Sequence, residues 1–239
     1  MRILFVITAR GGSKGIPKKN ITNLGGMPLI AYKINAAKGC KFDKRIIVST
    51  DNEEIAAVAK KYGAEVPFVR PYALATDTAR SEDVVQHAIE WVKIHDEKIY
   101  DYVCLLEPSS PFLTYEDINE AFERMEESKA DTLLGMKEVD VSRKLINTLD
   151  ERGMLGYFFE EINGLNSIRR QDFATEYTMN GCIYAARFSY FEFNKTFHSF
   201  NSIPYIMSKE KSVEIDSPYD LLFAQFLIEN EIIDISKWY

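Results

Sequence analysis

The sequence predicts an α/β fold in which helices cover both faces of a mostly parallel β-sheet. Three short apolar runs, residues 2–8, 45–50 and 102–108, are continuous and rich in β-branched side chains. Such runs are typical of parallel strands that are buried on both faces. Segments with helical periodicity lie between them, and this alternation indicates a parallel sheet with helical crossovers.

The first predicted helix, residues 51–63, directly follows the second strand. Asp51 is its expected N-terminal cap, Glu53 and Glu54 occupy the first turn, and Gly63 ends it. Its expected apolar face consists of Ile55, Val58, Ala59 and Tyr62.

Three later helices carry their own start signals. Ser81 is the expected cap of one, and Thr114 with Asp117 resembles a capping box in the next. The last helix has Ser217 as its expected cap and Pro218 in its first position.

Composition excludes several classes of protein. The formal net charge of −7 argues against general nucleic-acid binding. Cys40, Cys104 and Cys182 are scattered, without the spacing of a disulfide framework or a zinc site. No apolar stretch reaches about 18 residues, so we expect no membrane span and a cytoplasmic protein.

Residues 137–180 interrupt the alternation of strands and helices. This segment mixes aromatic with basic side chains and shows no clean amphipathic helix. We expect a small β-rich arm inserted into a single domain that spans residues 1–239. Exposed aromatic side chains on such an arm would favour a subunit interface.

The chain is polar where each predicted strand ends, in TARGGSKG, STDNEE and EPSSPF. The carboxyl ends of parallel strands meet at one edge of a sheet, which is where ligands bind in open α/β folds. A binding site is therefore expected at this edge.

The first of these loops lies within residues 7–20, ITARGGSKGIPKKN. It matches neither the P-loop nor the dinucleotide motif. Gly11, Gly12 and Gly15 can nevertheless let the backbone approach a ligand and offer N–H groups to its oxygens.

Cations surround the same loop. Arg10 offers a bidentate fork and Lys14 and Lys19 offer point charges, a set that suits a triphosphate or a departing pyrophosphate. Asn20 could bind a base or a ribose, whereas Lys18 is expected in solvent. The alternative is a Gly-rich turn with a solvated lysine pair.

Six blocks in fixed order resemble the CMP-sugar synthetases, in particular the acylneuraminate cytidylyltransferases. They are residues 9–20, 49–66, 70–81, 105–112, 169–172 with 177–181, and 212–221. The resemblance implies a Rossmann-like domain and transfer of CMP from CTP to a sugar acid, with release of pyrophosphate. It also implies a homodimer whose small arms exchange between subunits.

The resemblance assigns the nucleotide end of the site. It implies that CTP binds in the glycine loop, at Arg10, Gly11, Gly12, Lys14, Lys19 and Asn20, and in a nucleotide pocket that includes Arg70 and Ser81. The alternative for Arg70 is a surface salt bridge.

Acidic side chains near the C-terminus suggest a metal site. Glu214 and Asp216 alternate along a predicted strand, so both carboxylates should face the same side. Such oxygen ligands suit one or two Mg²⁺ ions, and the family holds its metal at these positions. The alternative for Asp216 is a role at the start of the last helix, where Asp220 is expected in the first turn.

The resemblance also assigns the sugar end of the site, to Glu107, Lys144, Arg169 and Arg170. The family usually has Gln where Glu107 stands, which suggests a substrate other than plain N-acetylneuraminate. One of the two arginines, Arg170 rather than Arg169 by preference, resembles an arm residue that meets the substrate. The expected catalytic set is Arg10, Lys19, Asp216 and Arg170.

The resulting hypothesis is a cytidylyltransferase acting on N-acetylneuraminate or a related nonulosonate such as legionaminate. Alternatives are a CMP-Kdo synthetase, whose loop differs from ARGGSKGIPKKN, and a glycosyltransferase, which would need a D-x-D motif. A third is an inactive, nucleotide-binding regulatory subunit.

Overall fold

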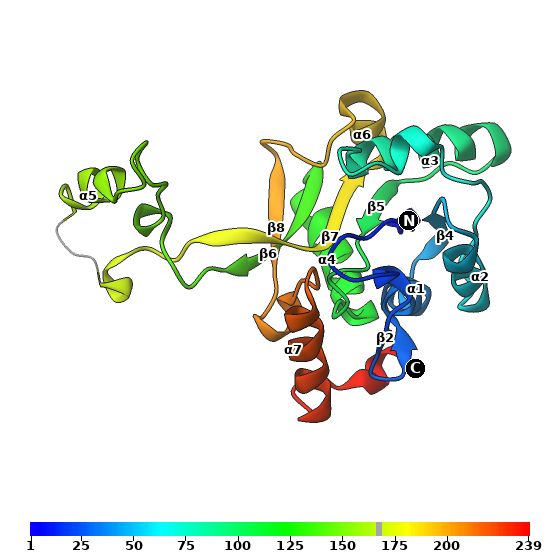
Figure 1. The fold of residues 1–239 in the computed structure, drawn as a ribbon. Helices are drawn as coiled ribbons and strands as arrows, with labels where there is room; N and C mark the ends of the chain where they lie inside the picture. Colours follow the sequence, from blue (N-terminus) through cyan, green and yellow to red (C-terminus); the bar gives the residue numbers. More distant parts are fainter. Residues whose placement is uncertain (166–168) are drawn as a thin grey trace.

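A six-stranded sheet runs through the molecule in the order β4-β1-β5-β7-β6-β8 (Figure 1). The computed structural model describes residues 1–165 and 169–239. The strands are β1 (Arg2–Thr8), β4 (Asp43–Ser49), β5 (Tyr102–Leu106), β6 (Thr132–Glu138), β7 (Tyr177–Arg187) and β8 (Ser202–Ile206). β7 runs antiparallel to β5 and β6, whereas β1 is parallel to β4 and β5, and β6 to β8. The predicted mostly parallel sheet is confirmed.

Both faces of the sheet are covered. Along β1, Ile3, Phe5 and Ile7 pack in one core with α1, α2, α4 and α7, while Leu4 and Val6 pack in a second core with α3 and α6. This two-sided burial explains why β1 is a continuous apolar run. The helices are α1 (Leu29–Gly39), α2 (Glu53–Lys61), α3 (Ser81–His95), α4 (Tyr115–Ser128), α6 (Phe188–Asn194) and α7 (Pro218–Glu229). A short hairpin, β2 (Asn23–Leu24) with β3 (Met27–Pro28), precedes α1.

The predicted helix starts are confirmed in two cases and wrong in two. Full capping boxes begin α4, between Thr114 and Asp117, and α7, at Ser217. Asn52, not Asp51, caps α2 through its side chain. Ser81 is the first residue of α3, and its hydroxyl bonds elsewhere. Both errors arise because a capping residue can be recruited by a distant part of the chain.

An arm projects from the sheet between β6 and β7 (Figure 1). Its base is the paired end of these strands, where Glu138 faces Tyr177. Beyond the base, described residues 139–165 and 169–176 form helical turns and no strand, so the expected β-rich arm is wrong there. The tip contains α5 (Gly156–Ile162), whose seven residues are too few for a clear helical period.

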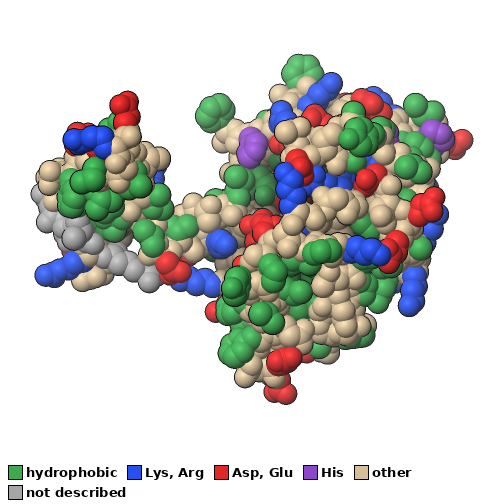
Figure 2. Space-filling model, viewed as in Figure 1, with side chains coloured by type: hydrophobic (Ala, Val, Ile, Leu, Met, Phe, Trp, Pro, Cys, Tyr) green, Lys and Arg blue, Asp and Glu red, His purple; other side chains and the backbone are tan. Residues whose placement is uncertain are grey.

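Apolar side chains gather on the arm tip, at the left of Figure 2. They include Ile146, Leu149, Met154, Leu155, Tyr157 and Phe159, all more than two-fifths exposed. The exposure expected for this segment is therefore present. Among the described residues, no helix is both long and apolar enough to cross a bilayer.

Candidate active site

A hollow of about 500 Å³ opens at the carboxyl edge of β1 and β5. It brings together segments that are far apart in the sequence. Of the predicted site residues, its lining contains Arg10, Lys14, Lys19, Asn20, Arg70, Ser81, Glu107, Glu214 and Asp216. The site expected at the strand exits thus coincides with a real cavity.

The loops after β1 and β4 are joined directly. The N–H of Gly11 donates to Oδ1 of Asp51 at 2.8 Å, so this N–H is engaged within the protein and Asp51 braces the loop. Gly12 faces open space, with no atom within 4 Å of an added Cβ. Asn20 is buried, and its Nδ2 donates to the carbonyl of Arg10 at 3.0 Å, which fixes the far end of the loop.

The glycine loop also packs against the C-terminal acidic segment. A Cβ added at Gly15 would overlap the carbonyl oxygen of Asp216. Nζ of Lys19 lies 2.7 Å from Oδ1 of the same aspartate. The cationic loop and the predicted metal ligands therefore form one site.

The segment 213–216 alternates as predicted, although it forms no strand ladder. Val213 and Ile215 are buried, Glu214 and Asp216 are exposed, and the N–H of Ile215 donates to the carbonyl of Ser109 at 2.7 Å. The predicted strand is wrong, because single hydrogen bonds hold the segment extended. The two carboxylates nevertheless line the same hollow.

As metal ligands, these two acids would leave most of the coordination positions to other groups. Across residues 1–165 and 169–239, no group of three or more His, Cys, Asp or Glu side chains is arranged to hold a metal. Mg²⁺ binds through one or two carboxylates together with substrate phosphates, so Glu214 and Asp216 fit this mode.

Arg70 is buried below the hollow. Its Nε donates to Oγ of Ser49 at 3.1 Å, and its Nη2 donates to the Ser49 carbonyl. Burial lowers the pKa of Arg70 to about 10, opposed by the nearby Asp51. The alternative of a surface salt bridge for Arg70 is wrong, because its described partners are oxygens of neutral groups.

Glu107 follows β5 and is half-buried in the hollow. The hydroxyl of Ser81 donates to its Oε1 at 3.0 Å. Burial raises the pKa of Glu107, and Glu214 raises it further, whereas the Ser81 hydrogen bond lowers it. Ser81 thus orients a carboxylate that burial pushes toward the neutral form.

β7 passes close to Glu214 at a glycine, Gly181. Gly181 has φ of +69°, and an added Cβ would lie 2.6 Å from Oγ of Ser110 and 3.5 Å from Oε1 of Glu214. The Asn180–Gly181 pair is thus part of strand β7 and lies beside the hollow.

Sequence reasoning missed Lys33, which is fully buried in α1 and donates from Nζ to the carbonyl of Cys182 at 2.8 Å. The available signal was a lysine between apolar neighbours, Tyr32 and Ile34, in the first half of the helix.

Similarity to known proteins identifies the family to which this chain belongs. Residues 4–231 match the family described as cytidylyltransferase. The chain belongs to that family. It is a nucleotidyltransferase, and CTP is its nucleotide substrate.

Relatives match this cytidylyltransferase over nearly its whole length. It is 35% identical to a pseudaminic acid cytidylyltransferase of Campylobacter jejuni, over 95% of this chain and 96% of the relative. It is also 35% identical to the CMP-N,N'-diacetyllegionaminic acid synthase of Legionella pneumophila, over 96% and 97%. An N-acylneuraminate cytidylyltransferase of Escherichia coli is 34% identical, over 93% of this chain and 51% of that longer protein.

A solved structure supports the fold. A CMP:2-keto-3-deoxy-manno-octonic acid synthetase complexed with CTP superposes with a TM-score of 0.70 at 15% identity, covering 97% of this chain and all of the other. The predicted Rossmann-like architecture is thereby confirmed.

Two of the predicted arm residues, Lys144 and Arg169, do not line the hollow of their own chain. Lys144 is exposed in a short turn near the ring of Phe173, and Arg169 is exposed beyond α5. The Arg170 side chain falls outside the described residues. Of the predicted sugar-binding residues, Glu107 thus lines the hollow, whereas Lys144 and Arg169 do not.

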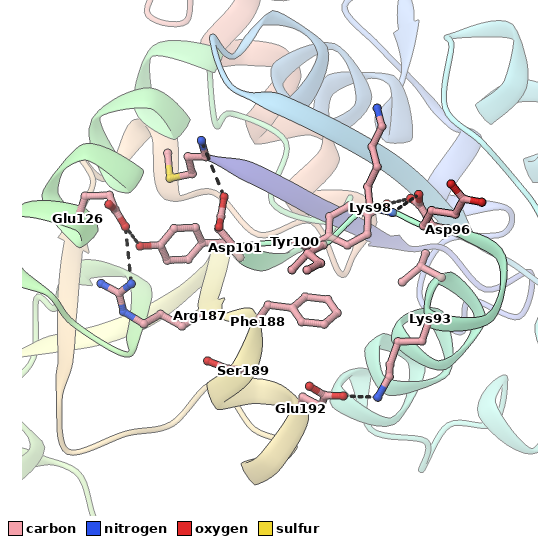
Figure 3. Close-up of a pocket in the computed structure, with 15 residues that line it drawn as sticks. Lys93, Asp96, Lys98, Tyr100, Asp101, Glu126, Arg187, Phe188, Ser189 and Glu192 are labelled. Atoms are coloured by element: carbon pink, nitrogen blue, oxygen red, sulfur yellow. Dashed lines mark hydrogen bonds and ion pairs between the residues drawn. The ribbon is translucent and has the colours of Figure 1, made fainter.

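A larger hollow, of about 760 Å³, lies at the opposite end of the sheet (Figure 3). Its charged groups bind one another: Arg187 lies 3.7 Å from Glu126, Tyr102 donates to Glu126, and Lys93 pairs with Glu192. Because Arg10, Lys14 and Lys19 are paired as well, ion pairing does not distinguish the two hollows. The hollow at the strand exits is the one that lies where open α/β folds bind ligands.

Proposed function

We propose that this cytidylyltransferase transfers CMP from CTP to the anomeric hydroxyl of a nine-carbon sugar acid. The acceptor is N-acetylneuraminate or a related nonulosonate such as legionaminate or pseudaminate. The observation that carries the proposal is one hollow holding Arg10, Lys14 and Lys19 together with Glu214 and Asp216. Relatives named for such transfers match the chain along nearly its full length.

The proposed reaction is an in-line displacement. The anomeric oxygen attacks the α-phosphorus and forms a P–O bond, the bond from this phosphorus to the β-phosphate bridging oxygen breaks, and the hydroxyl proton is lost. Arg10, Lys14 and Lys19 neutralise the triphosphate and the pyrophosphate that leaves with the bonding electrons. Positioning of the reactants and neutralisation of charge supply most of the rate enhancement.

Glu214 and Asp216 would hold Mg²⁺, as one or two ions. When bound, the metal supplies charge neutralisation for the phosphate oxygens. Lys19, already 2.7 Å from Asp216, orients this carboxylate at the junction of the two charge groups.

The nucleotide is assigned to the loop and to the segment below it. Gly12, where an added Cβ would meet no atom within 4 Å, admits the phosphates. Arg70 and Ser81 belong to the nucleotide pocket, and Asn20 keeps the loop in shape. Glu107, held by Ser81, faces the acceptor and favours a sugar whose substituents donate hydrogen bonds.

We further propose a homodimer in which residues 137–180 are an arm of the single domain 1–239. The arm's Lys144, Arg169 and Arg170 would serve the partner's hollow, because in their own chain the first two do not line it. The exposed apolar tip supports this, since such surfaces favour a subunit interface. α7 also exposes Tyr219, Leu222, Phe223 and Phe226, spaced as one helix face beside the acids.

The test is release of pyrophosphate from CTP and Mg²⁺ with a panel of acceptors. The panel contains N-acetylneuraminate, legionaminate and pseudaminate, with eight-carbon Kdo as the competing substrate. Release with a nonulosonate but not with Kdo supports the proposal. Release with Kdo alone would favour a Kdo synthetase, and none with any acceptor would favour a regulatory subunit.

A further inference from the structure

One carboxylate occupies two of the cations that the proposed reaction needs. Oδ1 of Asp77 lies 2.6 Å from Nη1 of Arg10, and Oδ2 lies 2.6 Å from Nζ of Lys14. The carboxylate therefore bridges these side chains through both oxygens. Phosphate oxygens would use the same donors.

Asp77 reaches the hollow from the segment between Arg70 and α3, and it lines the cavity itself. Its side chain is 45% exposed, and the two cations are its described ion-pair partners. Hydrogen bonds from Lys14 and Arg10 lower the pKa of Asp77, so the group is an anion at neutral pH.

We propose that Asp77 is an internal counter-anion that competes with phosphate oxygens for Arg10 and Lys14. This inference rests on the proposed function for its biological setting. Asp77 keeps the two cations together at the hollow. It is a positioning residue, because it acts on the phosphates through these two side chains.

The competition affects the two phosphate ligands unequally. CTP also has a base and a ribose to bind, whereas pyrophosphate has its phosphates alone. A negative charge beside the cations weakens the binding of both ligands through Coulomb repulsion. For pyrophosphate the loss is a larger fraction of the total binding free energy. Asp77 would therefore favour release of the product over loss of the substrate.

The same loop contains a matched control. Nζ of Lys18 lies 2.6 Å from Oε2 of Glu54, and the Glu54 side chain is 53% exposed, but neither residue lines the hollow. Asp77→Asn and Glu54→Gln each remove one negative charge paired with a lysine of this loop. A difference between them reports the position of the charge rather than the net charge of the protein.

The experiment is isothermal titration of the whole protein with inorganic pyrophosphate in the absence of sugar, for wild type, Asp77→Asn, Asp77→Glu and Glu54→Gln. We expect Asp77→Asn to bind pyrophosphate about tenfold more tightly, with Glu54→Gln and Asp77→Glu within about threefold of wild type. In turnover assays, Asp77→Asn should lower the inhibition constant of pyrophosphate more than the KM for CTP.

Asp77→Ser, also neutral, provides a second variant should the amide fold poorly. Unchanged or weaker pyrophosphate binding in a neutral variant that melts like wild type would overturn the proposal, as would a wild type that binds no pyrophosphate. Because binding needs no acceptor sugar, absence of turnover would refute the proposed function and leave the Asp77 result intact.

Discussion

Nζ of Lys19 lies 2.7 Å from Oδ1 of Asp216, although 197 residues separate them in the sequence. Lys19 is 17% exposed and Asp216 is 67% exposed. The lysine is thus fixed by the fold, while the carboxylate remains accessible. This pair joins the phosphate-binding loop to the proposed metal ligands.

Asp216→Asn should reduce turnover by at least about 100-fold, because the amide is a poor metal ligand and a weaker partner for Lys19. The melting temperature should change by less than about 2 °C, since the side chain is largely exposed. Pyrophosphate release and differential scanning calorimetry measure the two effects.

Asp43→Asn is the matched control for this change. Asp43 is 63% exposed and lies at the start of β4, at the other end of the sheet. The Asp43→Asn variant should retain wild-type turnover. An active Asp216→Asn enzyme would show that this residue does not hold the metal.

Gly15→Ala should lower activity by about 100-fold while the protein stays folded. The new Cβ would overlap the carbonyl oxygen of Asp216, so the loop must move away from the acidic segment. Gly164→Ala, whose Cβ would meet only an ordinary contact at 4.0 Å in the arm, is the control. Equal activity of the two variants would mean that the loop tolerates displacement, contrary to the geometry argued above.

The sequence predicted the sheet and the location of the site well because both follow from local patterns. β1 is apolar on both faces and therefore had to be a central strand, and parallel strands bring their exits to one edge. Arg10 and Lys19 belong to the loop that follows β1, so their location at this edge needed no knowledge of distant contacts.

The errors concern side chains whose partners are far away in the sequence. Asp51 is of a residue type that often caps helices, but its side chain accepts a hydrogen bond from the N–H of Gly11. The hydroxyl of Ser81 likewise donates its hydrogen bond to Glu107. Asp77 pairs with Arg10 and Lys14, which lie far before it in the sequence. No local pattern distinguishes these choices, because several acceptors compete for each donor and tertiary packing decides.

Glu107→Gln should stabilise the protein at alkaline pH. Burial raises the pKa of Glu107 above its ordinary value of 4.5, so the folded state holds this proton more strongly than the unfolded chain. The stability from this group is complete below the unfolded pKa and is lost as the pH rises through the folded one. The neutral amide escapes that loss and should melt about 3 °C higher at pH 8.

The comparison at a second pH isolates the titration of Glu107. The difference in melting temperature between Glu107→Gln and wild type should shrink as the pH falls toward 4.5. A difference that stays constant from pH 8 to pH 4.5 would indicate a packing effect of the amide. Calorimetry in buffers of equal ionic strength measures it.

Two inactive variants should restore activity when mixed if the arm serves the partner subunit. One variant carries Asp216→Asn, and the other replaces Lys144, Arg169 and Arg170 with Ala. In a heterodimer one site receives both defects and the other receives neither. After denaturation and joint refolding, about half the dimers are mixed, so about a quarter of wild-type activity should return.

If the arm serves its own chain, each site carries one defect and activity stays near that of the separate variants. Refolding each variant alone supplies that baseline.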